Sequence, residues 1–174
     1  MNLSKYVQAL KTHPDFGEAF VFHRSLPSSR PVYGSQLTFH DDLAATMQRL
    51  DIDKLYSPQV EAIDHLRNGS NVIVATPTAS GKSLIYNLVV LEEALKNPET
   101  KALYVFPLKA LAQDQLKMLN PWLKGVAHEE ISAAIYDGDT TPYKRKKIRT
   151  EPPQILITNP DMLHRGILAH HESW

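Results

Sequence analysis

The chain has 174 residues, 43% apolar and 22% charged, which suits one globular domain and excludes wholesale disorder. Lys plus Arg and Asp plus Glu number 19 each, so any basic surface must be local. The absence of cysteine excludes thiol catalysis, cysteine-ligated metals and disulfides, and it fits a reducing compartment such as the cytoplasm. No apolar run approaches the ~20 residues of a membrane helix, so we expect no membrane partner.

The first 40 residues differ in composition from the rest. Ser4–Lys11 is compatible with one short helix, whereas 13–40 carries three prolines, two glycines and a serine cluster. We therefore predict an irregular N-terminal arm over 1–40 and a folded domain over 41–174. Asp41 and Asp42 predict the start of a helix that runs to Leu50.

The pattern then becomes that of a parallel α/β protein. Pro58 predicts the first turn of another helix, which Asn68-Gly69 ends. Four short apolar runs without alternation predict strands buried on both faces, at 71–75, 102–106, 132–136 and 154–158. Leucine-rich helical patterns separate the first from the second and the second from the third. The sequence thus predicts a mostly parallel sheet with helices on both faces.

A phosphate-binding loop follows the first predicted strand. The pattern is that of a P-loop, G-x-x-x-x-G-K-[ST], with Thr76 in place of the first glycine. Backbone N–H groups at a helix start favour phosphate oxygens, Lys82 supplies a positive charge, and the Ser83 hydroxyl can ligate Mg²⁺. The predicted nucleotide-binding residues of the loop are Thr76, Pro77, Thr78, Ala79, Ser80, Gly81, Lys82 and Ser83.

This loop resembles motif I of the superfamily 2 helicases of the DEAD/DEAH type. Three further segments occur in the order that this family uses: 56–59 (YSPQ) resembles the glutamine motif, 106–113 (FPLKALAQ) motif Ia, and 158–161 (TNPD) motif Ib. The segments 136–140 (YDGDT) and 158–163 (TNPDML) are similar to those of the bacterial mitomycin-repair DNA helicases and their fungal relatives. The resemblance covers roughly 50–174 and implies a RecA-like fold, ATP and Mg²⁺.

The resemblance assigns roles to residues whose chemistry alone leaves two interpretations open. The Gln59 amide has one donor and one acceptor, which complement adenine; without the resemblance, a surface glutamine at a helix start is the simpler interpretation. Tyr56 is predicted to pack on the base, and ordinary packing beside Pro58 is the alternative. Lys82 is the predicted catalytic residue, and Ser83 the predicted Mg²⁺ ligand.

The predicted nucleic-acid contacts follow strand ends, where parallel sheets bind their ligands. Lys109 and Gln113 lie one helical turn apart and can hold a backbone phosphate. The resemblance adds Asp139. Thr158, Asn159 and Asp161 offer a similar site, for which a plain helix cap is the alternative. The basic run 144–149 is either a further phosphate surface or a solvated helix face.

The sequence contains no Asp-Glu-x-His segment, the acidic motif that this family uses for hydrolysis. Asp137 ends an apolar run but is followed by Gly138, which cannot orient water. We therefore expect the chain to be part of a RecA-like domain ending before its Walker B strand, and to hydrolyse no ATP alone.

The intact protein is expected to be an ATP-dependent DNA helicase acting in repair, moving 3′ to 5′ along DNA that is single-stranded or partly duplex. A second RecA-like domain is the expected partner within the same protein. An RNA helicase and a nucleotide-binding module without turnover are the alternatives.

Overall fold

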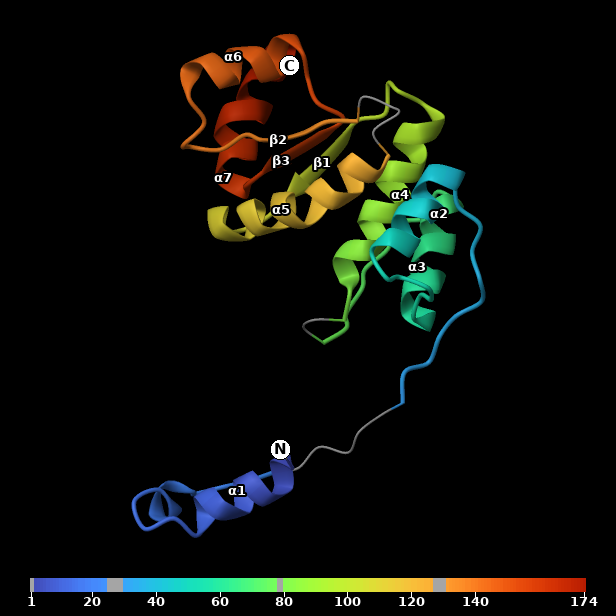
Figure 1. The fold of residues 1–174 in the computed structure, drawn as a ribbon. Helices are drawn as coiled ribbons and strands as arrows, with labels where there is room; N and C mark the ends of the chain where they lie inside the picture. Colours follow the sequence, from blue (N-terminus) through green and yellow to red (C-terminus); the bar gives the residue numbers. More distant parts are fainter. Residues whose placement is uncertain (1, 25–29, 78–79, 127–130) are drawn as a thin grey trace. The chain divides into compact units, whose positions relative to one another are not determined.

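The computed structural model describes residues 2–24, 30–77, 80–126 and 131–174 (Figure 1). The chain divides into two compact units, Met1–Pro31 and Val32–Trp174. No described helix is both long enough and apolar enough to cross a membrane.

The first unit contains the helix α1 (Leu3–Lys11) and the 3₁₀ turn η1 (Gly17–Ala19). The Asn2 side chain begins α1 by accepting hydrogen bonds from the Ser4 and Lys5 backbone N–H groups. This confirms the predicted helix at 4–11. Neither element has a buried residue.

The division between the units falls earlier than the predicted boundary at residue 40. The segment Val32–His40 belongs to the second unit, because its backbone pairs with the chain before α3. Tyr33 forms an isolated antiparallel bridge with Tyr56. The Gly34 N–H donates to the Leu55 carbonyl at 3.0 Å, and the Ser57 N–H donates to the Val32 carbonyl at 2.9 Å. A Pro- and Gly-rich composition does not reveal such pairing.

Three helices of the second unit precede the sheet in the chain: α2 (Asp41–Arg49), α3 (Ser57–Arg67) and α4 (Lys82–Lys96). Both helices predicted between residues 41 and 69 are confirmed. The His40 ring caps α2 by accepting from the Asp42 N–H, and α3 ends before Gly69, whose φ of 75° suits glycine. Leu88 and Leu91 of α4 are fully buried, at the centre of the core.

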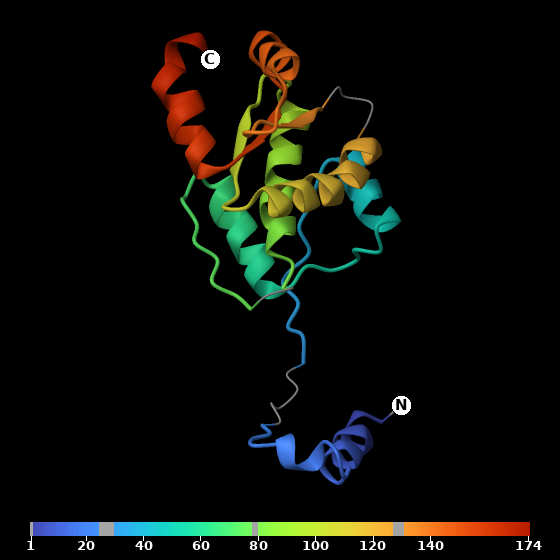
Figure 2. The ribbon, with the colours of Figure 1, turned by 90° about the vertical axis from the view of Figure 1, so that its left-hand side faces the viewer.

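The sheet consists of β1 (Ala102–Val105), β2 (Ala133–Ile135) and β3 (Ile155–Thr158), in the order β1-β3-β2. Both pairings are parallel, with Ala102 and Ala133 opposite Ile155. The helix α5 (Lys109–Gly125) connects β1 to β2, and α6 (Pro142–Thr150) connects β2 to β3 (Figure 2). The predicted α/β class with a parallel sheet is confirmed.

The helices cover the sheet unevenly. The Tyr104 hydroxyl of β1 donates to Asn87 of α4 at 3.1 Å, and burial raises the pKa of that tyrosine. The helix α5 contacts β2 and β3. On the other side of β1, Leu103 and Val105 are exposed. The predicted cover of helices on both faces is therefore incomplete at β1.

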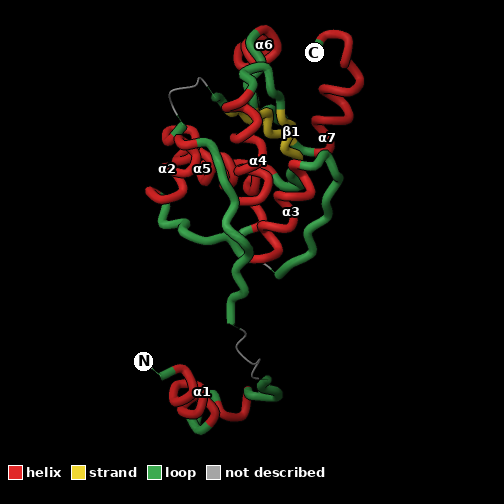
Figure 3. Tube along the Cα trace, turned by 90° about the vertical axis from the view of Figure 1, so that its right-hand side faces the viewer, coloured by secondary structure: helices red, strands yellow, loops and turns green. Residues whose placement is uncertain are grey.

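The predicted first strand at 71–75 is not a strand in the structure. This segment before the phosphate loop is irregular, and within the described ranges the strands are β1, β2 and β3 (Figure 3). Val72 and Val74 pack on the core, whereas Ile73 between them is 97% exposed. A strand needs a neighbour for its backbone hydrogen bonds, and among the described residues none pairs with this segment. The prediction of a strand buried on both faces is therefore wrong here.

After β3 the chain continues through α7 (Pro160–Met162), the π-helical turn η2 (Leu163–Ile167) and the 3₁₀ segment η3 (Leu168–Ser173). The Trp174 indole N–H donates to the Gly166 carbonyl at 3.2 Å, and its ring meets Tyr136 edge-on at 4.7 Å. These contacts hold the C-terminal turns beside β2.

Candidate nucleotide and nucleic-acid sites

The described part of the phosphate loop joins the start of α4, as the sequence predicts. Gly81 is the N-cap of α4 with φ of 74°, a left-handed conformation that favours glycine. Lys82 and Ser83 are the first two helical residues, where backbone N–H groups have no partner within the helix. Thr78 and Ala79 lie outside the described residues. The arrangement provides the donors that a phosphate requires.

The Lys82 ammonium group points back into its own loop. It donates to the carbonyls of Thr76 at 2.8 Å and Pro77 at 2.7 Å, and the Ser80 hydroxyl is 3.3 Å away. The hydroxyls of Thr76 and Ser80 are 2.6 Å apart. A phosphate that binds Lys82 would replace these neutral carbonyls with charged oxygens, which accept stronger hydrogen bonds.

Ser83 lies half-buried beside Lys82, and its side chain hydrogen-bonds to Tyr86. Burial raises the pKa of Tyr86, and the hydrogen bond with Ser83 opposes that shift. A hydroxyl at this position fits the chemistry of a Mg²⁺ ligand that works together with nucleotide phosphates. Across the described ranges, no group of three or more His, Asp and Glu side chains is arranged to hold a metal ion by itself.

Gln59 connects the glutamine motif to the phosphate loop. Its side chain is only 4% exposed, which excludes the simpler interpretation of a surface glutamine. The Oε1 atom accepts from the Tyr56 N–H at 2.9 Å, and Nε2 donates to the Gly81 carbonyl at 3.0 Å. A Cβ atom on Gly81 would lie 2.5 Å from Nε2, so this contact requires glycine. The predicted contact with adenine stays a prediction.

A cavity of ≈ 460 Å³ lies beside Gln59 and Gly81. Tyr33 and Tyr56 line it, with their rings stacked at 5.3 Å and 13°. The Lys54 ammonium group lies 5.8 Å from the centre of the Tyr33 ring. Sequence reasoning identified Tyr56 but missed Tyr33, since nothing in the Pro- and Gly-rich segment around it indicates a partner more than 20 residues away.

The structure brings two predicted nucleic-acid residues together at the end of the sheet. Lys109, the first residue of α5, forms a 2.8 Å ion pair with Asp139, and both side chains are exposed. The hydrogen bond with Asp139 raises the pKa of Lys109. Gln113, one turn along α5, is exposed and lines a hollow that Asp139 also lines.

Hydrogen bonds made by Asp137 and Arg145 hold the loop that carries Asp139. The Asp137 carboxylate accepts from the Asp139 N–H at 3.0 Å and from the Thr140 hydroxyl at 3.1 Å. The Arg145 guanidinium group donates to the carbonyls of Thr140 at 2.9 Å and Asp137 at 3.0 Å. Because the Asp137 carboxylate is buried and used within the loop, the geometry agrees with its exclusion as the Mg²⁺ residue.

Two of the three residues predicted to contact nucleic acid at or after the end of β3 make hydrogen bonds within the fold. The Thr158 side chain is 1% exposed, and its hydroxyl donates to the Tyr136 carbonyl at 2.7 Å. The Asn159 side chain caps α7 by accepting from the Met162 N–H at 2.9 Å, which is the alternative that the sequence left open. Asp161 is exposed in the first turn of α7. The structure thus gives Thr158 a structural role, and nucleic-acid contacts by these residues stay predictions.

Comparison with known proteins identifies the family. The family model described as DEAD/DEAH box helicase matches residues 56–173, which include Gln59, Lys82, Lys109 and Asp139. The chain belongs to the DEAD/DEAH box helicase family. The predicted superfamily is thereby confirmed.

Individual relatives of this helicase-family chain support the predicted subfamily. The chain is 45% identical over 132 residues to the uncharacterized ATP-dependent helicase YprA of Bacillus subtilis, covering 76% of this chain and 17% of YprA. It is 44% identical over 130 residues to the ATP-dependent helicase HRQ1 of Saccharomyces cerevisiae, covering 73% of this chain and 12% of HRQ1. The chain thus spans less than a fifth of either relative.

Solved structures agree with the fold. The DUF1998 helicase MrfA bound to DNA and AMPPNP matches with a TM-score of 0.80 and 40% identity, over 84% of this chain and 20% of MrfA. The helicase Lhr of Mycobacterium smegmatis bound to ssDNA and AMP-PNP matches with a TM-score of 0.66 and 30% identity, over 72% of this chain and 17% of Lhr.

Proposed function

We propose that this helicase-family chain is the nucleotide- and DNA-binding part of an ATP-dependent DNA helicase that acts in repair. The observation that carries the proposal is the contact of Gln59 with Gly81, directly beside Lys82. It brings two motifs that are more than 20 residues apart in sequence into contact, which supports one shared nucleotide site. The relation to MrfA, which was solved with both DNA and AMPPNP, supports the pairing of that site with a DNA surface.

At the nucleotide end, we assign the phosphates of ATP to Lys82 and to the backbone N–H groups at the start of α4. The Ser83 hydroxyl would hold Mg²⁺, which supplies positive charge between the phosphates when it is bound. The cavity beside Tyr56 and Gln59 would take the base. Lys82 would exchange its contacts with the Thr76 and Pro77 carbonyls for contacts with phosphate oxygens.

At the DNA end, Lys109 and Gln113 would hold a backbone phosphate, together with Asn159 and Asp161 at the next strand end. Asp139 would keep Lys109 in place until the strand arrives, since the two groups form an exposed ion pair. Such contacts position a strand and do not read its sequence. Stepping, with 3′ to 5′ as the proposed direction, would require a second RecA-like domain that closes over the nucleotide.

The first test is ATP binding and ATP turnover by the 174-residue chain, with and without single-stranded DNA, beside a Lys82→Ala variant. We expect nucleotide binding that Lys82→Ala removes, and no turnover. DNA-stimulated turnover that Lys82→Ala abolishes would contradict the expectation that the acidic motif is missing. Tight binding of ATP that DNA does not alter would favour a nucleotide-binding module over a motor.

The second test compares matched DNA and RNA strands in a salt titration, because backbone contacts give affinities that fall with salt. We expect DNA to bind at least as tightly as RNA at each salt concentration. A preference for RNA throughout would overturn the choice of DNA, since the 2′-hydroxyl is the feature that separates the two polymers.

A further inference from the structure

The basic helix α6 divides its cations between two hollows. Lys144 and Lys147 line one hollow, together with Gln113 and Asp139. Arg145 and Arg149 line another. Residues three or four apart share a face of a helix, so the two pairs face different sides. The run of basic residues that the sequence left ambiguous is therefore two surfaces and not one.

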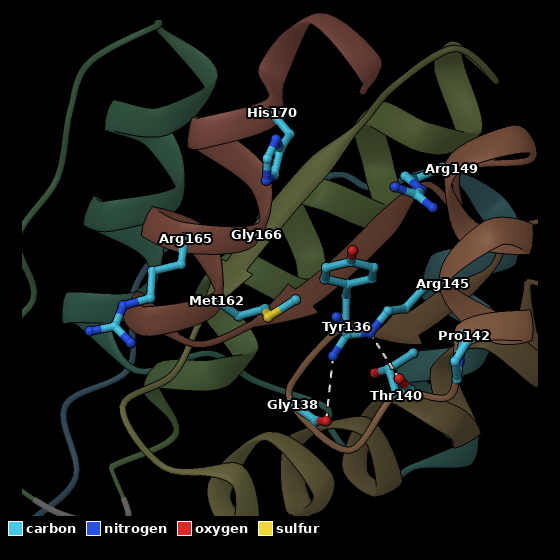
Figure 4. A pocket seen from close by; sticks show the side chains of 10 residues that line it. All are labelled: Tyr136, Gly138, Thr140, Pro142, Arg145, Arg149, Met162, Arg165, Gly166 and His170. Carbon is cyan, nitrogen blue, oxygen red and sulfur yellow. Dashed lines mark hydrogen bonds between the residues drawn. The ribbon is translucent and has the colours of Figure 1, made fainter.

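The second hollow, here called the arginine pocket, measures ≈ 760 Å³. Figure 4 shows Arg145 and Arg149 on one side of Tyr136, and Arg165 and His170 on the other. No Asp or Glu is among the described residues that line it. Arg149 and Arg165 are exposed, and no ion pair to either is found within the described part of the chain.

Both walls of the arginine pocket are fixed by the buried Tyr136 ring between them. The Arg145 guanidinium group lies 5.5 Å from the centre of this ring while it donates to the loop carbonyls of Asp137 and Thr140. On the other wall, Trp174 contacts the same ring and donates to the Gly166 carbonyl. The backbone segments that carry Arg149 and Arg165 are thus held in place by hydrogen bonds. Arg145 acts as a positioning residue for the wall that carries Arg149.

The arginine pocket adjoins the proposed DNA surface. Gly138 and Thr140 line the pocket, and they flank Asp139, which pairs with Lys109. A strand bound at Lys109 therefore has cationic surface directly across the 136–140 loop. Guanidinium groups suit phosphate because their planar N–H donors match two oxygens and remain charged at any physiological pH.

We propose that the arginine pocket binds a second backbone phosphate of the same DNA strand, beyond the one held at Lys109, through Arg149 and Arg165. This inference rests on the proposed DNA-binding function. It adds to that function a contact site in the turns after motif Ib, and it explains why α6 carries cations on two sides. A phosphorylated peptide is the other ligand of similar chemistry, and the test separates the two.

The test is a fluorescence anisotropy titration of the chain with single-stranded DNA of about 6 and about 12 nucleotides, within the range of known site sizes. An Arg149→Ala, Arg165→Ala double variant is compared with a Lys124→Ala, Lys146→Ala control, which removes the same charge from residues that line neither hollow. Because all four side chains are exposed, unchanged thermal unfolding is expected for both variants.

We expect the arginine variant to bind the longer strand several-fold more weakly than the control does, with the shorter strand unaffected. The salt slope for the longer strand should fall by about 0.7 for each phosphate that the variant no longer binds. Lys109→Ala should weaken binding of both strands. This length dependence distinguishes a second phosphate site from a general loss of charge.

Two outcomes overturn the inference alone and leave the proposed function standing. Equal losses in the arginine variant and the control would mean that these arginines are solvated cations. Unchanged DNA binding together with binding of a phosphoserine peptide that the arginine variant loses would assign the pocket to a phosphorylated protein. Failure of the unmodified chain to bind any DNA would instead overturn the proposed function, and this inference with it.

Discussion

Two ion pairs of equal length lie in different regions of this molecule and have different roles. Arg67 and Glu92 join α3 to α4 at 2.8 Å, and Lys109 and Asp139 meet at 2.8 Å at the end of the sheet. The Glu92 side chain is 7% exposed, whereas those of Lys109 and Asp139 are 50% and 76% exposed. Distance alone therefore does not reveal what a pair does.

The surroundings explain the difference. Arg67 donates two hydrogen bonds to Glu92 and a third to the Thr38 carbonyl, and it lies 4.7 Å from the centre of the Phe39 ring. Water would have to replace all of these contacts together. Lys109 has a single acceptor, Asp139, among the described residues, so solvent or a phosphate can exchange with it. The buried pair fixes structure, and the exposed pair is suited to ligand exchange.

The largest effect is expected from Glu92→Ala. Removing one partner leaves the Arg67 charge in a poorly solvated site, which should lower the free energy of unfolding by about 3 kcal/mol. Glu93→Ala is the matched control, because its exposed contact with Lys96 contributes little. Urea denaturation of both variants measures the difference. Equal stability of the two would show that the buried pair has no special role.

Two glycines have the same backbone conformation but different surroundings. Gly69 and Gly81 have φ of 75° and 74°, but an added Cβ meets nothing within 4 Å at Gly69 and lies 2.5 Å from Gln59 Nε2 at Gly81. Gly69→Ala should cost about 1 kcal/mol of stability and leave ATP affinity unchanged.

Gly81→Ala should cost the same strain and also break the contact with Gln59, lowering ATP affinity about tenfold. Isothermal titration with a non-hydrolysable ATP analogue measures that affinity. Equal affinities for the two variants would mean that Gln59 and the phosphate loop do not act together.

At the exposed pair, Lys109→Ala should weaken binding of single-stranded DNA several-fold at low salt. The slope of log affinity against log salt should decrease by about 0.7, because the variant has one cation fewer to pair with a phosphate. The free energy of unfolding should change little, in contrast to Glu92→Ala, because the pair is exposed. Unchanged DNA affinity and slope would remove Lys109 from the proposed surface.

The smallest effect is expected from Asp139→Asn, which should raise DNA affinity about twofold because exposed charges interact weakly. Asp139 raises the pKa of Lys109, so the variant should lower that pKa. A raised lysine pKa contributes to stability at pH below its ordinary value, and the contribution is lost as the pH rises through the folded value. An NMR titration of the Lys109 side chain measures the shift, and a weaker DNA complex would make Asp139 a direct contact.

The sequence predicted features that depend on local pattern. The helix α4 and its phosphate loop follow from a leucine repeat after Gly-Lys-Ser, and the three paired strands follow from short apolar runs. The pattern failed at 71–75, where pairing depends on a neighbour elsewhere in the fold and not on the run itself. The roles of Tyr33 and Arg145 were also hidden, because each depends on contacts made across the fold or with backbone carbonyls.

The two bonds of the Gln59 amide have a consequence for selectivity. The bonds to Tyr56 and Gly81 hold the amide in one orientation, and an amide has two N–H donors and two acceptor lone pairs, so a base can bind without breaking them. Under the proposed function, an amide held in this way would favour a base with the matching donor and acceptor order and penalise a base with the reverse order.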